Sequence, residues 1–223
     1  MKKFICLALI IAAFQSCNKH KTLTEASKKQ VIQELHNIEV LDQKFAGIPP
    51  QVLMDTYGPE KAWDIFEEQR DSVGVVNQER IKKLYETYGY LGEKMVGKEA
   101  ATHFWLPIQH ADNDEPFQQQ MLIAMGKEIE KGSKDKAHYA MLEDRINVNL
   151  KQPQRFGSQL TYNKLGQAIP KIGLVDSLRV DSLRNAFDLP DFKTYYNQMT
   201  IMHFEMNKSL FVERGINEPL LYQ

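Results

Sequence analysis

Apolar residues recur at intervals of three and four positions along most of this chain, and that spacing is typical of amphipathic α-helices. The clearest run begins at Thr24 and would place on one helical face Val31, Leu35, Ile38, Leu41 and Phe45. Comparable runs continue as far as Asn149. The spacing therefore predicts a mainly α-helical fold, and 43% hydrophobic residues are enough to fill its core.

Glycine, proline and short polar residues mark where these predicted helices begin and end. Gly47 and Pro49-Pro50 stop the first helix, and Gly58-Pro59 starts the next, which runs to Gly89. Asp112, Asn113 or Asp114 is expected to cap a later helix that has Pro116 in its first turn. The remaining helices are predicted at Gly97–His110, from the capping residue to Gly132, from Ser133 to about Asn149, at Val175–Leu189 and at Asp191–Met199.

One segment has the composition of β-strands. Arg155–Asn163 and Gln167–Ile172 flank a turn at Lys164-Leu165-Gly166, which predicts a small hairpin. No linker rich in Pro, Gly or Ser divides the chain. We therefore predict that residues 24–223 form a single helical domain of about six or seven helices, with a small β-hairpin near residues 155–172.

The first seventeen residues resemble a lipoprotein signal peptide. Lys2 and Lys3 precede the apolar run Phe4–Phe14, which is too short to span a bilayer, and Cys17 follows Ser16. We expect export to the bacterial cell envelope, removal of the residues that precede Cys17, and membrane anchoring through a fatty-acylated Cys17, with residues 18–23 as a tether. A plain secretory peptide cleaved nearby is the alternative.

The mature chain would then keep no cysteine for metal binding or nucleophilic catalysis, because Cys6 lies in the removed segment. The formal net charge is −1, and no basic stripe with interleaved aromatic residues is present. We expect no nucleic-acid partner and no cofactor.

Polar residues are concentrated in three places. Gln109, His110, Asp112, Asn113 and Asp114 fall within six positions, and the other two clusters are Asp144-Arg145 and Pro153–Gln159. We interpret the three clusters as one surface or pocket, because polar clusters inside a helical assembly need partners.

Four ordered blocks carry a resemblance to a known family: YGYLGEKMVGKEAATHFWLPIQHAD, YAMLEDRINVN, KQPQRFGSQL and VDSLRNAFDLPDFKTYY. They resemble an uncharacterised bacterial domain, domain of unknown function 6624, over roughly residues 71–196. The resemblance implies a mostly helical, often exported domain without an established activity. This chain departs from the family pattern at Pro107, where an aliphatic residue is usual, and at Phe156, where Tyr is usual.

His110, Asp112 and Asp114 are the residues that come nearest to a metal site, since imidazole and carboxylate are common ligands. On a continuous helix, however, Asp112 would point away from the other two. We therefore predict no metal site, with one aspartate capping a helix and His110 bonded to buried carbonyl groups.

An acid–base interpretation pairs His110 with Asp144 and uses Arg145 to bind an anionic group. The structural alternative is a buried Asp–Arg network that ties a helix to the hairpin. Asp112 and three glutamines could hydrogen-bond a sugar or peptide, although glutamines also satisfy backbone groups; these are Gln109, Gln154 and Gln159.

Two functions remain open on the sequence. The favoured one is an envelope lipoprotein that binds a small ligand, peptide or glycan, with an unknown envelope protein as a further partner. The alternative is a hydrolase that uses His110 and Asp144 with Arg145, with metal assistance as a variant. The chain has no nucleophile elbow, zinc-protease motif, P-loop or dinucleotide-binding glycine pattern, and this favours binding.

Overall fold

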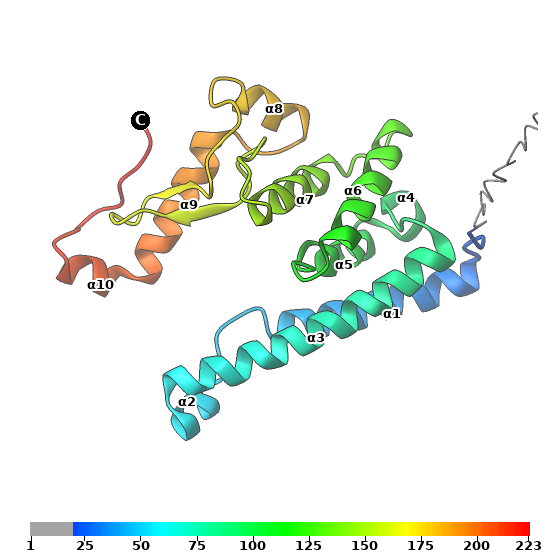
Figure 1. Cartoon of the computed structure of the whole chain (residues 1–223), viewed down its shortest axis with the longest axis horizontal. Helices are drawn as coiled ribbons and strands as arrows, with labels where there is room; N and C mark the ends of the chain where they lie inside the picture. Colours follow the sequence, from blue (N-terminus) through cyan, green and yellow to red (C-terminus); the bar gives the residue numbers. More distant parts are fainter. Residues whose placement is uncertain (1–19) are drawn as a thin grey trace, which may run out of the picture.

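The computed structural model describes residues 20–223. The predicted signal peptide and the predicted lipidation site at Cys17 lie outside the described residues. Within residues 20–223 the chain forms ten helices and one two-stranded antiparallel sheet (Figure 1). The predicted fold class, mainly α with a small hairpin, is therefore confirmed. In this range no helix combines the length and apolar character needed to cross a membrane.

Two long helices, α1 (Glu25–Lys44) and α3 (Pro59–Tyr88), pack against each other along one edge of the molecule (Figure 1). Thr24 caps α1 in a reciprocal capping box with Ser27, which fixes the start of the helix where the sequence predicts it. The 30 residues of α3 correspond to a length of about 45 Å. The short helix α2 (Gln51–Tyr57) packs against the first half of α3, and the two together project from the rest of the molecule.

The main core lies between α1, α3 and the next four helices. These are α4 (Glu93–Val96), α5 (Lys98–Gln109), α6 (Glu115–Glu130) and α7 (Lys136–Asn149). α5 is central, because it packs against α1, α3, α4, α6 and α7. The small residues Ala100 and Ala101 are both buried in this core and allow close approach of neighbouring helices. Larger side chains fill the rest, including Leu35, Ile38, Ile81, Phe104, Ile108 and Met121.

The C-terminal part of the chain is built on the hairpin. Strands β1 (Leu160–Tyr162) and β2 (Ala168–Pro170) pair antiparallel, with Thr161 opposite Ile169. They are followed by α8 (Val180–Ala186), α9 (Phe192–Met206) and α10 (Lys208–Glu213). A second, smaller apolar cluster, made by Ala140, Phe156 and Leu189, joins this part to α7.

Several predicted boundaries need correction. Ser133 does not cap α7: that helix begins three residues later, and the Ser133 hydroxyl instead accepts the N–H of Asp135 in the preceding turn. The strand predicted from Arg155 is paired only from Leu160. The helix predicted from Val175 begins at Val180, and α9 extends past its predicted end to Met206. The predicted tether is partly held, since the N–H of Lys21 donates to the carbonyl of Thr87 at 2.8 Å.

Candidate functional site

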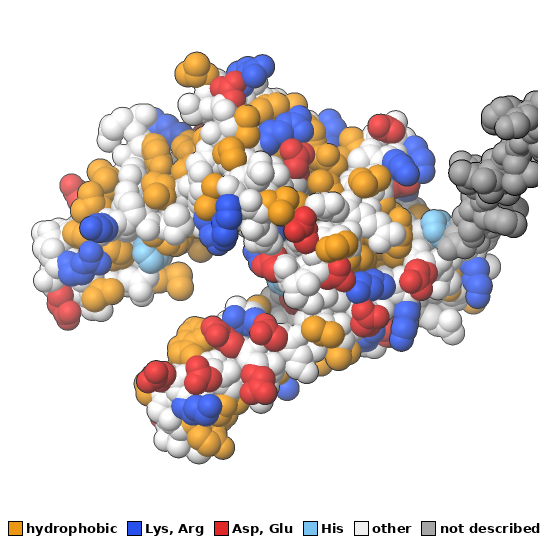
Figure 2. Space-filling model, viewed as in Figure 1, with side chains coloured by type: hydrophobic (Ala, Val, Ile, Leu, Met, Phe, Trp, Pro, Cys, Tyr) orange, Lys and Arg blue, Asp and Glu red, His pale blue; other side chains and the backbone are white. Residues whose placement is uncertain are grey.

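A cavity of about 550 Å³ opens where α1, α3, α7 and the turn between α5 and α6 meet. Figure 2 shows the molecule hollowed between the α2–α3 end and the C-terminal helices, with α3 forming one wall. Apolar side chains such as Phe45 and Val75 contribute part of the lining. The rest is polar and mostly charged: Asp42, Arg70, Asp71, Gln78, His110, Asp112, Asn113 and Arg145.

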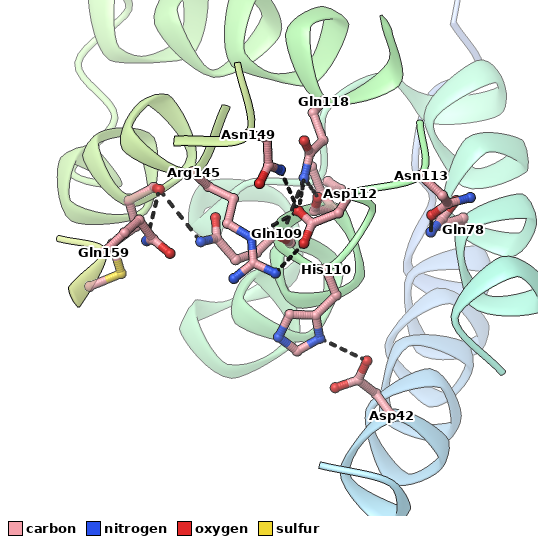
Figure 3. Close-up of polar contacts among 12 residues, drawn as sticks. Asp42, Gln78, Gln109, His110, Asp112, Asn113, Gln118, Arg145, Asn149 and Gln159 are labelled. Atoms are coloured by element: carbon pink, nitrogen blue, oxygen red, sulfur yellow. Dashed lines mark hydrogen bonds and ion pairs between the residues drawn. The ribbon is translucent and has the colours of Figure 1, made fainter. Parts of the chain in front are cut away.

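His110 stands at the end of α5, where the chain turns toward α6. Its N–H still donates to the carbonyl of Leu106 at 3.1 Å, so the turn begins at a fixed position. The imidazole Nδ1 lies 3.1 Å from Oδ1 of Asp42, near the end of α1 (Figure 3). The Asp42 side chain is only 9% exposed, whereas that of His110 is 43% exposed. A sheltered carboxylate thus orients an imidazole whose other nitrogen has no protein partner among the described residues.

Asp112 is the centre of a second group of polar contacts (Figure 3). Its carboxylate accepts two hydrogen bonds from the Arg145 guanidinium, with Nε at 2.8 Å, and a third from Asn149 Nδ2 at 2.7 Å. Partial burial raises the pKa of Asp112, but the hydrogen bonds from Arg145 and Asn149 outweigh it, so the net pKa is lowered. Asp112 is therefore ionised at neutral pH and holds Arg145 in one orientation at the cavity wall.

The turn that carries these residues is also fixed to α3 and α6. Gln78 and Asn113 exchange side-chain hydrogen bonds of 2.6 and 3.2 Å. Asp114, one of the three residues predicted to cap this helix, caps α6 by accepting the N–H of Phe117. Its carboxylate also forms an ion pair with Lys82 at 2.8 Å. The side chains of the turn are therefore held against α3, α6 and α7 by contacts within the protein.

Asp144 does not pair with His110, contrary to the sequence-based interpretation. Its side chain is fully buried and accepts the N–H groups of Arg155, Phe156 and Ser158 at 2.8, 3.1 and 2.8 Å. Burial raises the pKa of Asp144, and the backbone amides offset only part of that rise. Asp144 does tie α7 to the start of the hairpin, as the structural alternative expected, but it does so through backbone amides. The expected Asp–Arg network is not formed, because Arg145 pairs with Asp112 instead.

The three glutamines predicted to bind a ligand have backbone partners instead. Gln109 and Gln159 both donate to the carbonyl of Met141, each at 3.5 Å (Figure 3). Gln154 is buried, donates to the carbonyls of Gln159 and Lys171, and accepts the N–H of Gln159 at 2.7 Å. None of the three lines the cavity. The predicted polar clusters therefore touch one another, but only His110, Asp112, Asn113 and Arg145 reach the open space.

The residues nearest to a metal site, His110, Asp112 and Asp114, have separate partners and do not converge. Among residues 20–223, no group of three His, Cys, Asp or Glu side chains is arranged to hold a metal ion.

The part of the cavity wall that α1 and α3 contribute was not predicted from the sequence. Asp42, Arg70, Asp71 and Gln78 lie on long helices with many other polar residues, and no local spacing distinguishes them. Asp42 and His110 are 68 positions apart. Only the packing of α1 against α5 brings them together.

Neither curated proteins nor solved structures gave a match to this chain. A family model described as "Family of unknown function (DUF6624)" matches residues 32–203. The match begins well before residue 71, where the sequence blocks placed it, and so includes the parts of α1 and α3 that line the cavity. Because it covers more than half of the chain, the chain belongs to the DUF6624 family.

Proposed function

We propose that this protein binds a small polar ligand in the cavity between α1, α3, the α5–α6 turn and α7. The observation that carries the proposal is the cavity itself, whose volume of about 550 Å³ falls within the range of known small-molecule sites. Its lining combines a few apolar surfaces with charged groups from four parts of the chain. Such a mixture can both shelter a ligand and fix its orientation.

The preorganisation of the lining supports the proposal. Arg145 is held by Asp112, and His110 is held by Asp42, so neither side chain needs to be ordered by the ligand. Binding sites that are ordered in advance lose less conformational entropy on association. His110 keeps one ring nitrogen free to donate to, or accept from, a ligand.

The test is ligand binding by purified protein, measured by calorimetry after a thermal-shift screen of short peptides and oligosaccharides. We expect His110→Asn to weaken binding about tenfold, the equivalent of one hydrogen bond of about 1.4 kcal/mol. The same change should reduce the free energy of unfolding by less than about 1 kcal/mol, because the side chain is exposed to the cavity.

His103→Asn is the matched control. His103 lies on the same helix but lines a different surface, beside His36, and its substitution should leave binding unchanged. Equal affinities of wild type and His110→Asn for every ligand that binds would contradict the proposal that this cavity is the site.

A second candidate function, hydrolysis, is favoured by the His110–Asp42 pair. A carboxylate on Nδ1 orients the ring and supports proton transfer at Nε2, which is the arrangement of a general acid–base group. Asp42 would then have the role that the sequence assigned to Asp144. In the binding experiment, cleavage products formed by wild type but not by His110→Asn would establish this function, and unchanged ligands would exclude it for the compounds tested.

Export and lipid anchoring belong to the same proposal. They are supported by Lys2 and Lys3, the apolar run after them, and Ser16 before Cys17. We expect Cys17→Ala to abolish incorporation of labelled fatty acid into the protein in bacteria. Cys6→Ala is the control and should label like wild type, because Cys6 lies within the segment to be removed. Equal labelling of the Cys17→Ala protein would show that Cys17 is not the anchor.

A further inference from the structure

Most of the charged groups that line the central cavity already have a partner. Asp112 is bonded to Arg145, and Asp42 is bonded to His110. Two charged side chains are left, Arg70 and Asp71, which are neighbours on α3. Among residues 20–223, neither of them lies within ion-pair distance of an opposite charge.

Arg70 is held in place although it lacks a counter-ion. Its Nε donates to the carbonyl of Phe45 at 2.8 Å, and Nη2 donates to the carbonyl of Gly47 at 3.3 Å. The guanidinium also lies 5.3 Å from the centre of the Phe66 ring. These contacts use two of its five N–H groups, and within the described chain Nη1 has no partner. Arg70 thus presents an ordered positive charge with free donors to the cavity.

Asp71 supplies the opposite charge at the same wall. It is exposed, and its carboxylate makes no hydrogen bond to another described side chain. The apolar surfaces of Phe45 and Val75 lie in the same lining. The cavity therefore offers one free cationic group, one free anionic group and an apolar contact surface.

We propose that the ligand is a zwitterion, a short peptide with free ends, whose carboxylate binds Arg70 and whose ammonium group binds Asp71. This inference rests on the proposed binding function. A planar guanidinium matches a carboxylate, and charge-assisted hydrogen bonds are stronger than neutral ones. A neutral sugar in the same place would remove water from both charges without replacing it by an opposite charge, which disfavours binding.

The test compares ligands that differ only in their terminal charges. Three dipeptides with free ends (Ala-Ala, Ala-Phe and Gly-Gln) are titrated calorimetrically beside their N-acetylated and C-amidated forms, with maltose as a neutral ligand. We expect at least one free dipeptide to bind at least tenfold more tightly than either of its blocked forms. Blocking the ligand leaves the protein unchanged, so this comparison does not depend on the folding of any variant.

Asp71→Asn then assigns the ammonium site. The side chain is exposed and without side-chain partners, so the substitution should leave the fold intact. We expect it to abolish the difference between the free and the N-acetylated dipeptide, and to preserve the difference between the free and the C-amidated one. Glu68→Gln, also exposed on α3 but outside the cavity lining, is the matched control and should preserve both differences.

The outcomes separate this inference from the function on which it rests. In one outcome, maltose or the blocked dipeptides bind as tightly as the free dipeptides, and His110→Asn weakens that binding. The cavity is then a binding site, but its ligand is not a zwitterion. If free dipeptides are preferred but Asp71→Asn does not alter the preference, the assignment to this wall is overturned. If none of the free dipeptides binds, the inference is overturned, and the wider ligand screen decides the proposed function.

Discussion

Asp144→Ala is expected to lower the free energy of unfolding by about 3–5 kcal/mol. The fully buried carboxylate accepts the N–H groups of Arg155, Phe156 and Ser158, so the substitution leaves three backbone donors, one of them on a fully buried residue, without their acceptor. Each stranded donor costs about 1–3 kcal/mol, and partial relaxation of the loop keeps the sum below the maximum. Chemical denaturation monitored by circular dichroism measures the change.

Two other substitutions bracket that result. Asp144→Asn keeps one acceptor oxygen and should lose roughly half as much stability. Glu143→Gln changes the neighbouring carboxylate, which is only partly buried and pairs with Arg155 at 3.3 Å, and should cost no more than about 1 kcal/mol. If Asp144→Ala lost no more stability than Glu143→Gln, the three amide bonds would not be the reason that an aspartate stands at this position.

The role of Asp144 illustrates what the sequence could not reveal. Asp144 stands beside Arg145, and His110 ends another helix, so the three residue types together suggested an acid–base site. Its partners are backbone amides of a loop eleven to fourteen positions away, and amides carry no side-chain signature in the sequence. The true partner of His110 is Asp42, which lies 68 positions earlier on a helix that is otherwise ordinary in its pattern.

The helices were easier to predict than the site contacts, because burying one face of a helix makes apolar residues recur with the helical period of about 3.6 residues. α1, α3, α5 and α6 follow from that period together with Pro, Gly and capping residues. The two shortest early helices, α2 and α4, were not predicted. α2 has no fully buried residue, and α4 is only four residues long, so neither has enough length or apolar contrast to show a period. Tertiary packing against α3 and α5 accounts for them.

Two VDSLR segments in the C-terminal part of the chain also show that a short local sequence does not determine its own structure. Residues 175–179 and 180–184 are identical in sequence, yet the first forms a turn and the second starts α8. Arg179 is 77% exposed in its side chain and pairs with Asp176, whereas Arg184 is 1% exposed. Five residues cannot specify two environments, so the difference comes from what each segment packs against.

Arg184→Met is therefore expected to lower the free energy of unfolding by about 2–4 kcal/mol, although methionine has a similar length. Arg184 donates to the carbonyls of Pro190 at 2.6 Å, Phe156 at 2.8 Å and Gly157 at 3.2 Å. The hydroxyl of Tyr196 also donates to Gly157, so the substitution strands two carbonyls rather than three. Burial lowers the pKa of Arg184, and removing that desolvated charge offsets part of the loss.

Arg179→Met is the matched control, because it makes the same change within the same five-residue sequence. Its ion pair with Asp176 is exposed, and such pairs contribute about 0–1 kcal/mol. Equal losses for the two variants would mean that Arg184 does not fix the loop. A larger loss for Arg184→Met would show that the loop at residues 155–158 is held from both sides, with Asp144 binding its amides and Arg184 binding its carbonyls. Both charges would then stabilise the fold, which leaves the cavity lined by His110, Arg70 and Asp71 as the place to look for function.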